Sequence, residues 1–258
     1  MTSSERPVAV VTGGRRGIGL AIASALAKAG YEVAITDIDS PDIAEAALSD
    51  LRSLGAGIIY LQGDLADVAG HGRTIDAALE RFGRIDCLVN NAGIGAVARG
   101  DFLALSPENF DSVMATNLRG TVFFTQAVIN AMLTAGSAPH PRSIITITSI
   151  SAAATSPERL DYCISKAGLA AFSQGLALRL AASGIAVFEV RPGIIRTDMT
   201  AGVASKYDAL IAGGLVPMQR WGEPADIGAI CAALASGSFA FATGSVIGAD
   251  GGLSIARL

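Results

Sequence analysis

The chain has 258 residues, of which 51% are hydrophobic and only 16% are charged, and its formal net charge is −4. This length suffices for a well-buried core, and we expect residues 1–258 to form a single α/β domain. The hydrophobic composition indicates extensive burial, either in a parallel sheet covered on both faces or in subunit interfaces. The negative charge and the lack of a basic cluster argue against nucleic acid as a partner.

Cysteine usage and the N-terminal segment bear on the compartment. Cys87, Cys163 and Cys231 are scattered and odd in number, and no Cys/His spacing typical of a metal site is present. We therefore interpret them as reduced core thiols in a cytoplasmic protein, and we expect no bound metal. Residues 1–7 are polar and lack the apolar core of a signal peptide, and no run of about 18 apolar residues predicts a membrane span.

Short apolar strands alternate with helical segments along the chain. The predicted strands are residues 8–11, 32–36, 57–61, 87–90, 143–148, 186–190 and 245–248. The predicted helices are residues 18–29, 43–53, 72–82, 110–135, 162–182 and 225–235. This repeated strand–helix–strand pattern favours a parallel, doubly wound sheet of the Rossmann type, with about seven strands and with helices on both faces.

A glycine-rich segment, residues 12–19, connects the first predicted strand to the first predicted helix and reads Thr-Gly-Gly-Arg-Arg-Gly-Ile-Gly. Glycines let the backbone approach a ligand closely, and the free N–H groups and the dipole of a helix N-terminus favour negative charge. A strand, a glycine-rich turn and a helix start together predict a pyrophosphate site. The segment is not a Walker-type phosphate loop, because no Gly-Lys-Ser/Thr follows.

Ser149, Tyr162 and Lys166 form a second group of candidate functional residues. Tyr162 and Lys166 are four residues apart and therefore share one face of a predicted helix, where an ammonium favours the phenolate that otherwise forms only near pH 10. Ser149 follows an apolar run, so we expect its hydroxyl at a strand end, where it can hold a substrate oxygen beside the phenol. This arrangement suits proton transfer to or from an alcohol or a ketone.

The order of these motifs resembles that of the short-chain dehydrogenase/reductase family, over essentially the whole chain. Residues 12–19 match the family's Thr-Gly-x-x-x-Gly-x-Gly motif, and residues 90–93 match its Asn-Asn-Ala-Gly motif. Residues 192–197, with Pro-Gly and a threonine, match the segment that contacts the nicotinamide end of the cofactor. The tail 243–252 looks like the family's last strand and the turn that follows it.

The resemblance also carries over a catalytic tetrad, which consists of Asn117, Ser149, Tyr162 and Lys166. It implies hydride transfer between a nicotinamide cofactor and a ketone or secondary alcohol, with Tyr162 transferring the proton and Ser149 holding the reacting oxygen. Lys166 is expected to lower the tyrosine pKa and to hold the nicotinamide ribose. Asn117 is expected to hold a water that connects Lys166 to solvent.

The resemblance further implies which residues contact the cofactor and the substrate. The expected cofactor contacts are Gly13, Arg15, Arg16, Gly17, Ile18, Gly19, Asp37, Asp64, Leu65, Asn91, Ala92, Gly93, Tyr162, Lys166, Pro192, Gly193, Ile195 and Thr197. Ser151, Arg159 and Met199 are expected in the substrate pocket, although Arg159 also fits a solvated rim. Residues 197–222 are expected to form a lid over the substrate.

Two charged residues bear on the choice between NAD and NADP. Asp37 ends the second predicted strand, where an acid bonds the ribose 2′-hydroxyl of NAD and repels the 2′-phosphate of NADP. Arg16 argues the other way, since many NADP-using members of the family carry a basic residue there. An Arg16–Asp37 ion pair would blunt both effects. We predict NAD(H) as the cofactor, with NADP(H) as the alternative.

Within the family, the chain looks most like the 3-oxoacyl-[acyl-carrier-protein] reductase group and the sugar and polyol dehydrogenases close to it. The resemblance implies a small-molecule or acyl-thioester substrate and a homotetramer. Residues 131–135 lack the basic residue that carrier-protein reductases often show, and this weakens the assignment of a carrier-protein partner. A non-catalytic NAD-binding sensor is a further alternative, against which the intact tetrad argues.

Overall fold

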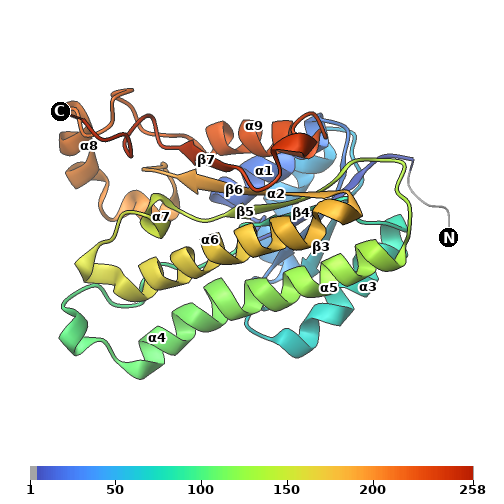
Figure 1. Ribbon diagram of the computed structural model, residues 1–258, viewed down its shortest axis with the longest axis horizontal. Helices are drawn as coiled ribbons and strands as arrows, with labels where there is room; N and C mark the ends of the chain where they lie inside the picture. The colour runs from blue at the N-terminus through green and yellow to red at the C-terminus, as the bar shows by residue number, and fades with distance from the viewer. Residues whose placement is uncertain (1–4, 258) are drawn as a thin grey trace.

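The computed structural model describes residues 5–257, and its strands form one parallel sheet (Figure 1). Within these residues the strands are β1 (Val8–Thr12), β2 (Glu32–Asp37), β3 (Ile58–Gln62), β4 (Cys87–Asn90), β5 (Arg142–Ile147), β6 (Ile185–Pro192) and β7 (Val246–Ala249). Their spatial order is β3-β2-β1-β4-β5-β6-β7, and every neighbouring pair is parallel. The predicted doubly wound sheet of the Rossmann type is confirmed.

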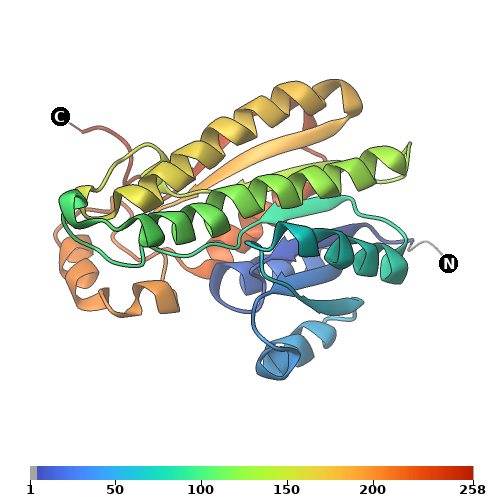
Figure 2. The same cartoon turned by 90° about the horizontal axis from the view of Figure 1, so that it is seen from below.

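Helices cover both faces of this sheet (Figures 1 and 2). Along the described chain they are α1 (Gly17–Lys28), α2 (Pro41–Arg52), α3 (His71–Phe82), α4 (Pro107–Val113), α5 (Thr121–Thr134), α6 (Leu160–Leu180), α7 (Asp198–Ala201), α8 (Ala204–Ala212) and α9 (Pro224–Ala235). The apolar side chains of α1, α2 and α9 pack on one face, and those of α3, α5 and α6 pack on the other. None of the helices within residues 5–257 is long and apolar enough to cross a bilayer.

The alternation of side chains along β1 builds both layers of the core. Ala9 and Val11 pack in the layer of α1 and α9, whereas Val8 and Val10 pack in the layer of α3 and α5. All four are at most 2% exposed, because successive side chains of a strand point to opposite faces and both faces of this sheet are covered. The near-continuous apolar run of the sequence is therefore a consequence of a strand buried on both sides.

The order of the strands also places the functional site. Strand β2 pairs with one edge of β1, and strand β4 pairs with the other edge of β1. The connections that leave β1 and β4 therefore diverge, and a crevice opens at the carboxyl ends of the strands, where ligands bind in sheets of this type.

The predicted helix over residues 110–135 is interrupted in the structure. It consists of α4, a π-helical segment (Met114–Gly120) and α5. Gly120 ends the π-helical segment where the backbone lies against the carbonyl of Leu65, so that any side chain would collide. Short π-helical segments inside α-helices are frequent at functional sites, and this one carries Asn117.

Candidate active site

A cleft of about 1330 Å³ lies at the carboxyl ends of the strands and is lined by segments that follow β1, β2, β3, β4, β5 and β6. Pockets for small molecules usually measure roughly 300–1,000 Å³. The cleft is therefore large enough for a dinucleotide together with a second ligand. Nearly all of the predicted site residues line it, and the exceptions are Arg15 and Asn117.

The glycine-rich turn forms the floor at one end of the cleft. Gly13 and Gly17 have φ angles of 64° and 54°, which other residues adopt only under strain. A Cβ atom on Gly19 would collide with the carbonyl oxygen of Gly13, so α1 begins in close contact with the turn. The amide of Asn91 fixes this contact by donating to the carbonyl oxygens of Thr12 and Gly13, both at 3.0 Å.

This turn fits the pyrophosphate of a dinucleotide. The backbone lacks side chains where a ligand has to approach, and the N-terminus of α1 faces the cleft. At the opposite end, Gly93 leaves space that a Cβ atom would fill, since that atom would lie 3.1 Å from Asn117 Oδ1 and 3.6 Å from Lys166 Nζ. The residues present thus fit an extended cofactor that reaches from the turn to the lysine.

Acidic side chains lie at the end of β2 and just after it, at the expected adenosine end of the cleft. Asp37 Oδ2 accepts a hydrogen bond from the backbone N–H of Arg15 at 3.2 Å, and the Arg15 side chain forms an ion pair with Asp39. Arg16 instead pairs with Asp198 at 3.1 Å. The Arg16–Asp37 ion pair considered from the sequence is therefore wrong, because the Arg16 side chain extends across the cleft toward α7. Arg15 was also predicted to contact the cofactor, but its guanidinium forms an ion pair with Asp39 and it does not line the cleft.

The other predicted cofactor contacts lie along the same cleft. Asp64, Leu65, Asn91, Ala92, Gly93, Pro192, Gly193, Ile195 and Thr197 all line it. Asp64 Oδ1 also accepts the N–H of Ala66 at 2.8 Å, so this carboxylate caps the turn after β3. Thr197 forms a capping box with Thr200 at the start of α7, which fixes the end of the β6 segment next to Gly17.

Ser149, Tyr162 and Lys166 come together at the inner end of the cleft. Ser149 follows β5, and its Oγ accepts the N–H of Ser151 at 3.0 Å. Lys166 is 4% exposed; its Nζ donates to the carbonyl oxygen of Ile147 at 3.0 Å and lies 5.8 Å from the centre of the Tyr162 ring. Helix α6 therefore presents the tyrosine and the lysine on one face toward the end of β5, as their spacing predicts.

Asn117 lies behind the wall of the cleft and is fully buried. Its Oδ1 accepts the N–H of Ile94 at 2.8 Å, and its Nδ2 donates to the carbonyl oxygen of Ile94 at 2.9 Å and to Ser165 Oγ at 3.1 Å. Both amide hydrogens are thus used within the protein. The side chain connects the segment after β4 to α6, next to the turn that carries Lys166.

Electrostatics at this end of the cleft differ from the sequence-based expectation. Burial raises the pKa of Tyr162, and it is opposed by a hydrogen bond with Ser149 and by the positive charges of Arg159 and Arg99. Burial also lowers the pKa of Lys166 to about 8, so its ammonium is still mostly protonated at pH 7. The charges that lower the tyrosine pKa here are therefore those of the two arginines, whereas the sequence assigned this effect to the lysine.

The predicted substrate residues Ser151, Arg159 and Met199 line the cleft beside the tyrosine. The guanidinium of Arg159 lies over the Tyr162 ring, 5.4 Å from its centre. Arg99 also lines this region, and the sequence analysis missed it. The available signal was an arginine in the loop after β4, since loops at the carboxyl end of a parallel sheet converge on the ligand.

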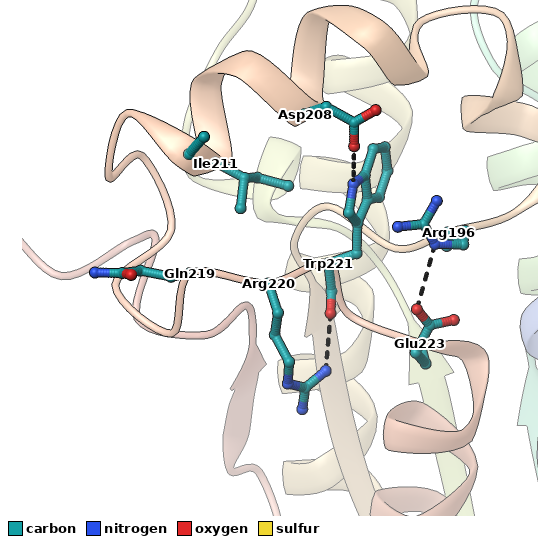
Figure 3. Close-up of a pocket in the computed structure, with 8 residues that line it drawn as sticks. Arg196, Asp208, Ile211, Gln219, Arg220, Trp221 and Glu223 are labelled. Atoms are coloured by element: carbon teal, nitrogen blue, oxygen red, sulfur yellow. Dashed lines mark hydrogen bonds and ion pairs between the residues drawn. The ribbon is translucent and has the colours of Figure 1, made fainter.

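The segment from α7 to Trp221 borders the outer side of the cleft through Met199, Val203 and Tyr207. Figure 3 shows how Trp221 is held: its indole N–H donates to Asp208 of α8 at 2.7 Å, and the Arg196 guanidinium lies 4.8 Å from its ring. The indole is only 6% exposed. It therefore connects α8 to the segment that leads into α9.

Fold and site together define a nicotinamide-dependent oxidoreductase of the Rossmann type, and comparison with known proteins names the family. A family model described as enoyl-(acyl carrier protein) reductase matches residues 13–254. The chain is 34% identical to a 3-oxoacyl-[acyl-carrier-protein] reductase of Synechocystis sp., covering 98% of this chain and 99% of that protein. The chain belongs to the short-chain dehydrogenase/reductase family and is an NAD(P)-dependent enzyme that interconverts a ketone and a secondary alcohol.

Solved structures show the same similarity. A 3-oxoacyl-[acyl-carrier protein] reductase from Brucella melitensis in complex with NAD is 68% identical, with a TM-score of 0.97, and the match covers 99% of this chain and 100% of that one. A putative 2-deoxy-D-gluconate 3-dehydrogenase from Agrobacterium tumefaciens with bound NADP is 32% identical, with a TM-score of 0.86 and 97% of both chains covered. The chain is thus similar to proteins described with either cofactor.

Proposed function

We propose that this enzyme uses NAD(H) to interconvert 3-oxoacyl-type ketones and the corresponding secondary alcohols. The observation that carries the proposal is the convergence of Ser149, Tyr162 and Lys166 at one end of a cleft whose other end holds the glycine-rich turn and Asp37. Relatives described as 3-oxoacyl-[acyl-carrier-protein] reductases, similar over nearly the whole chain, support the substrate class.

In the proposed reaction each side chain of the tetrad has one task. The bound nicotinamide supplies or accepts the hydride. Tyr162 gives its proton to the carbonyl oxygen in reduction and removes it in oxidation, while Ser149 holds that oxygen by a hydrogen bond. The buried Lys166 would hold the ribose next to the nicotinamide. Asn117 acts by positioning, because it fixes the backbone at Ile94 and the helix turn at Ser165.

The preference for NAD(H) is supported by the charges at the adenosine end. Asp37 lines the cleft there, and a 2′-phosphate at about 4 Å would be repelled by roughly 1–4 kcal/mol, depending on the local dielectric. Arg15 is paired with Asp39 and Arg16 with Asp198, so neither guanidinium is free for a phosphate without losing an ion pair. The description of the Brucella protein as a complex with NAD agrees with this preference.

The proposed function is tested by the initial rates of NADH and NADPH oxidation with an acetoacetyl thioester. We expect a clear rate with NADH, a rate with NADPH at least tenfold lower, and loss of both in Tyr162→Phe, because general acid catalysis contributes about 10²–10⁴-fold. A higher rate with NADPH would overturn the cofactor preference. Tight binding of NADH without turnover of any ketone would favour the sensor alternative.

A dehydrogenase of sugars or polyols is the second candidate. It is favoured by the 32% identity to the protein described as a putative 2-deoxy-D-gluconate 3-dehydrogenase, which covers 97% of both chains. The two candidates share the same hydride and proton transfer and differ in the substrate. Reduction of NAD in the presence of sugar alcohols or sugar acids, without turnover of 3-oxoacyl compounds, would support the second candidate.

We also propose that the enzyme is a homotetramer of the kind expected from the family. Exposed apolar side chains on α5, α6 and near β7 support this assembly, among them Phe123, Leu178, Phe241 and Val246. Large exposed apolar side chains on neighbouring elements are typical of subunit interfaces. Light scattering at micromolar concentration tests the assembly, and a monomeric mass would contradict it.

A further inference from the structure

Two arginines of the cleft, Arg99 and Arg159, form no ion pair with any of residues 5–257. Each of the other arginines that line the cleft has an acidic partner: Arg16 pairs with Asp198 at 3.1 Å, and Arg73 lies 3.8 Å from Asp67. Both of those pairs are at the cofactor end. The unpaired positive charge is therefore concentrated at the substrate end, beside Tyr162.

The two arginines come from different segments that the backbone holds together. The N–H of Gly100 donates to the carbonyl oxygen of Glu158 at 3.1 Å. Arg99 and Arg159 are the sequence neighbours of these two residues, so they lie on adjacent segments of the backbone. Arg159 is further fixed by its position over the Tyr162 ring, 5.4 Å from the centre. The loop after β4 and the residue that precedes α6 thus each contribute an arginine to the lining of this part of the cleft.

The carboxylates that flank Arg159 in the sequence, Glu158 and Asp161, form no ion pair with Arg99 or Arg159. Asp161 is 1% exposed, and its Oδ1 accepts the N–H of Tyr162 at 2.7 Å, but it forms no ion pair with either arginine. Glu158 is exposed and likewise forms no ion pair within the described chain. Unpaired positive charge in a cleft concentrates ligands of the opposite sign, and the planar guanidinium group matches the two oxygens of a carboxylate.

We propose that the substrate is a short oxo or hydroxy carboxylic acid whose carboxylate is bound by Arg99 and Arg159, while its ketone or alcohol oxygen lies at Tyr162 and Ser149. The proposal rests on the proposed function and narrows its substrate from 3-oxoacyl compounds in general to free acids. The phosphate of a phosphopantetheine arm does not fit, because it is separated from the reacting ketone by the whole pantetheine chain. Arg159 lies over the ring of the tyrosine, and Arg99 lines the same cleft.

The test is a comparison of 3-oxobutanoate with its uncharged methyl ester as substrates for NADH oxidation. In the unmodified enzyme, kcat/KM for the acid is expected to exceed that for the ester by about 10- to 100-fold, the usual effect of a hydrogen-bonded charge. Arg99→Met and Arg159→Met should each reduce this ratio by about tenfold. The ratio is the informative quantity, because loss of Arg159 also changes the pKa of Tyr162 and so affects both substrates.

Two further variants complete the experiment. Arg159→Lys keeps the charge and should retain part of the preference for the acid. Arg81→Met removes an exposed arginine of α3, outside the cleft, and should leave the ratio unchanged. An equal or higher kcat/KM for the ester in the unmodified enzyme would overturn the proposal while leaving the proposed function intact. If the enzyme turned over none of the three compounds, the acid, the ester and the acetoacetyl thioester, that result would instead contradict the proposed function.

Discussion

The backbone N–H of Arg15 donates a hydrogen bond to the carboxylate of Asp37 at 3.2 Å, which fixes the acid at the end of β2 to the glycine-rich turn. This contact holds the carboxylate where the adenosine ribose is expected, and the Arg15 side chain is at the same time paired with Asp39. The proposed preference for NAD(H) therefore rests on a local arrangement of backbone and two acids rather than on a single side chain.

Asp37→Ala should shift the enzyme toward NADP. Removing the carboxylate abolishes repulsion of a 2′-phosphate worth roughly 1–4 kcal/mol, so the ratio of kcat/KM for NADPH to that for NADH should rise about tenfold or more. Asp39→Ala should act in the same direction, because it releases the Arg15 guanidinium. Asp50→Ala, an exposed change in α2 outside the cleft, serves as the control. Unchanged ratios in both cleft variants would contradict this account.

Gly19→Ala should abolish cofactor binding. The added Cβ atom would collide with the carbonyl oxygen of Gly13, so the turn would have to open. Gly72→Ala is the matched control, since that glycine lies in α3, where an added methyl group would meet no neighbouring atom within 4 Å, and it should tolerate alanine. Titration of NADH fluorescence measures the affinity. Retention of the affinity in Gly19→Ala, within about threefold of the control, would show that the turn does not hold the cofactor.

The stability of the cofactor-free enzyme should increase with pH between about 8 and 10.5, because burial lowers the pKa of Lys166 to about 8. In that window the unfolded chain retains the proton that the folded chain has lost, so the free energy of unfolding rises with pH. The full contribution is about 3 kcal/mol, from 1.36 kcal/mol per pKa unit. Urea midpoints of the unmodified enzyme and Lys166→Met, measured from pH 7.5 to 10, should therefore diverge. Parallel curves would show that the lysine keeps its ordinary pKa.

Trp221→Phe should loosen residues 197–222, the proposed lid. The change removes the hydrogen bond from the buried indole to Asp208, seen in Figure 3, and such a bond to a charged group contributes about 1.5–3 kcal/mol. Faster hydrogen exchange is expected in α8, together with a higher KM for the ketone. Asp208→Asn keeps an acceptor for the indole and should have a smaller effect. A loss of stability without faster exchange in α8 would argue against a lid held by Trp221.

The sequence alone determined the order of the strands, the helices that connect them except α7 and α8, and the residues at the two ends of the site. The strands were predicted to within two residues of their observed bounds, because apolar runs and glycine turns are local signals. The spacing of Tyr162 and Lys166 likewise fixes one helix face regardless of what packs against it. These features depend only on neighbouring residues, so they can be read from a single chain.

Only the tertiary structure decided which side chains pair across the cleft. Arg16 is bound to Asp198, 182 residues away, and a backbone hydrogen bond between Gly100 and Glu158 joins the segments that carry Arg99 and Arg159. Asn117 lies in a π-helical segment and is fully buried, where it bonds the backbone of Ile94 and the hydroxyl of Ser165. Such pairings depend on how loops that are distant in the sequence pack at the end of the sheet. No local pattern of residues specifies which of their side chains come together.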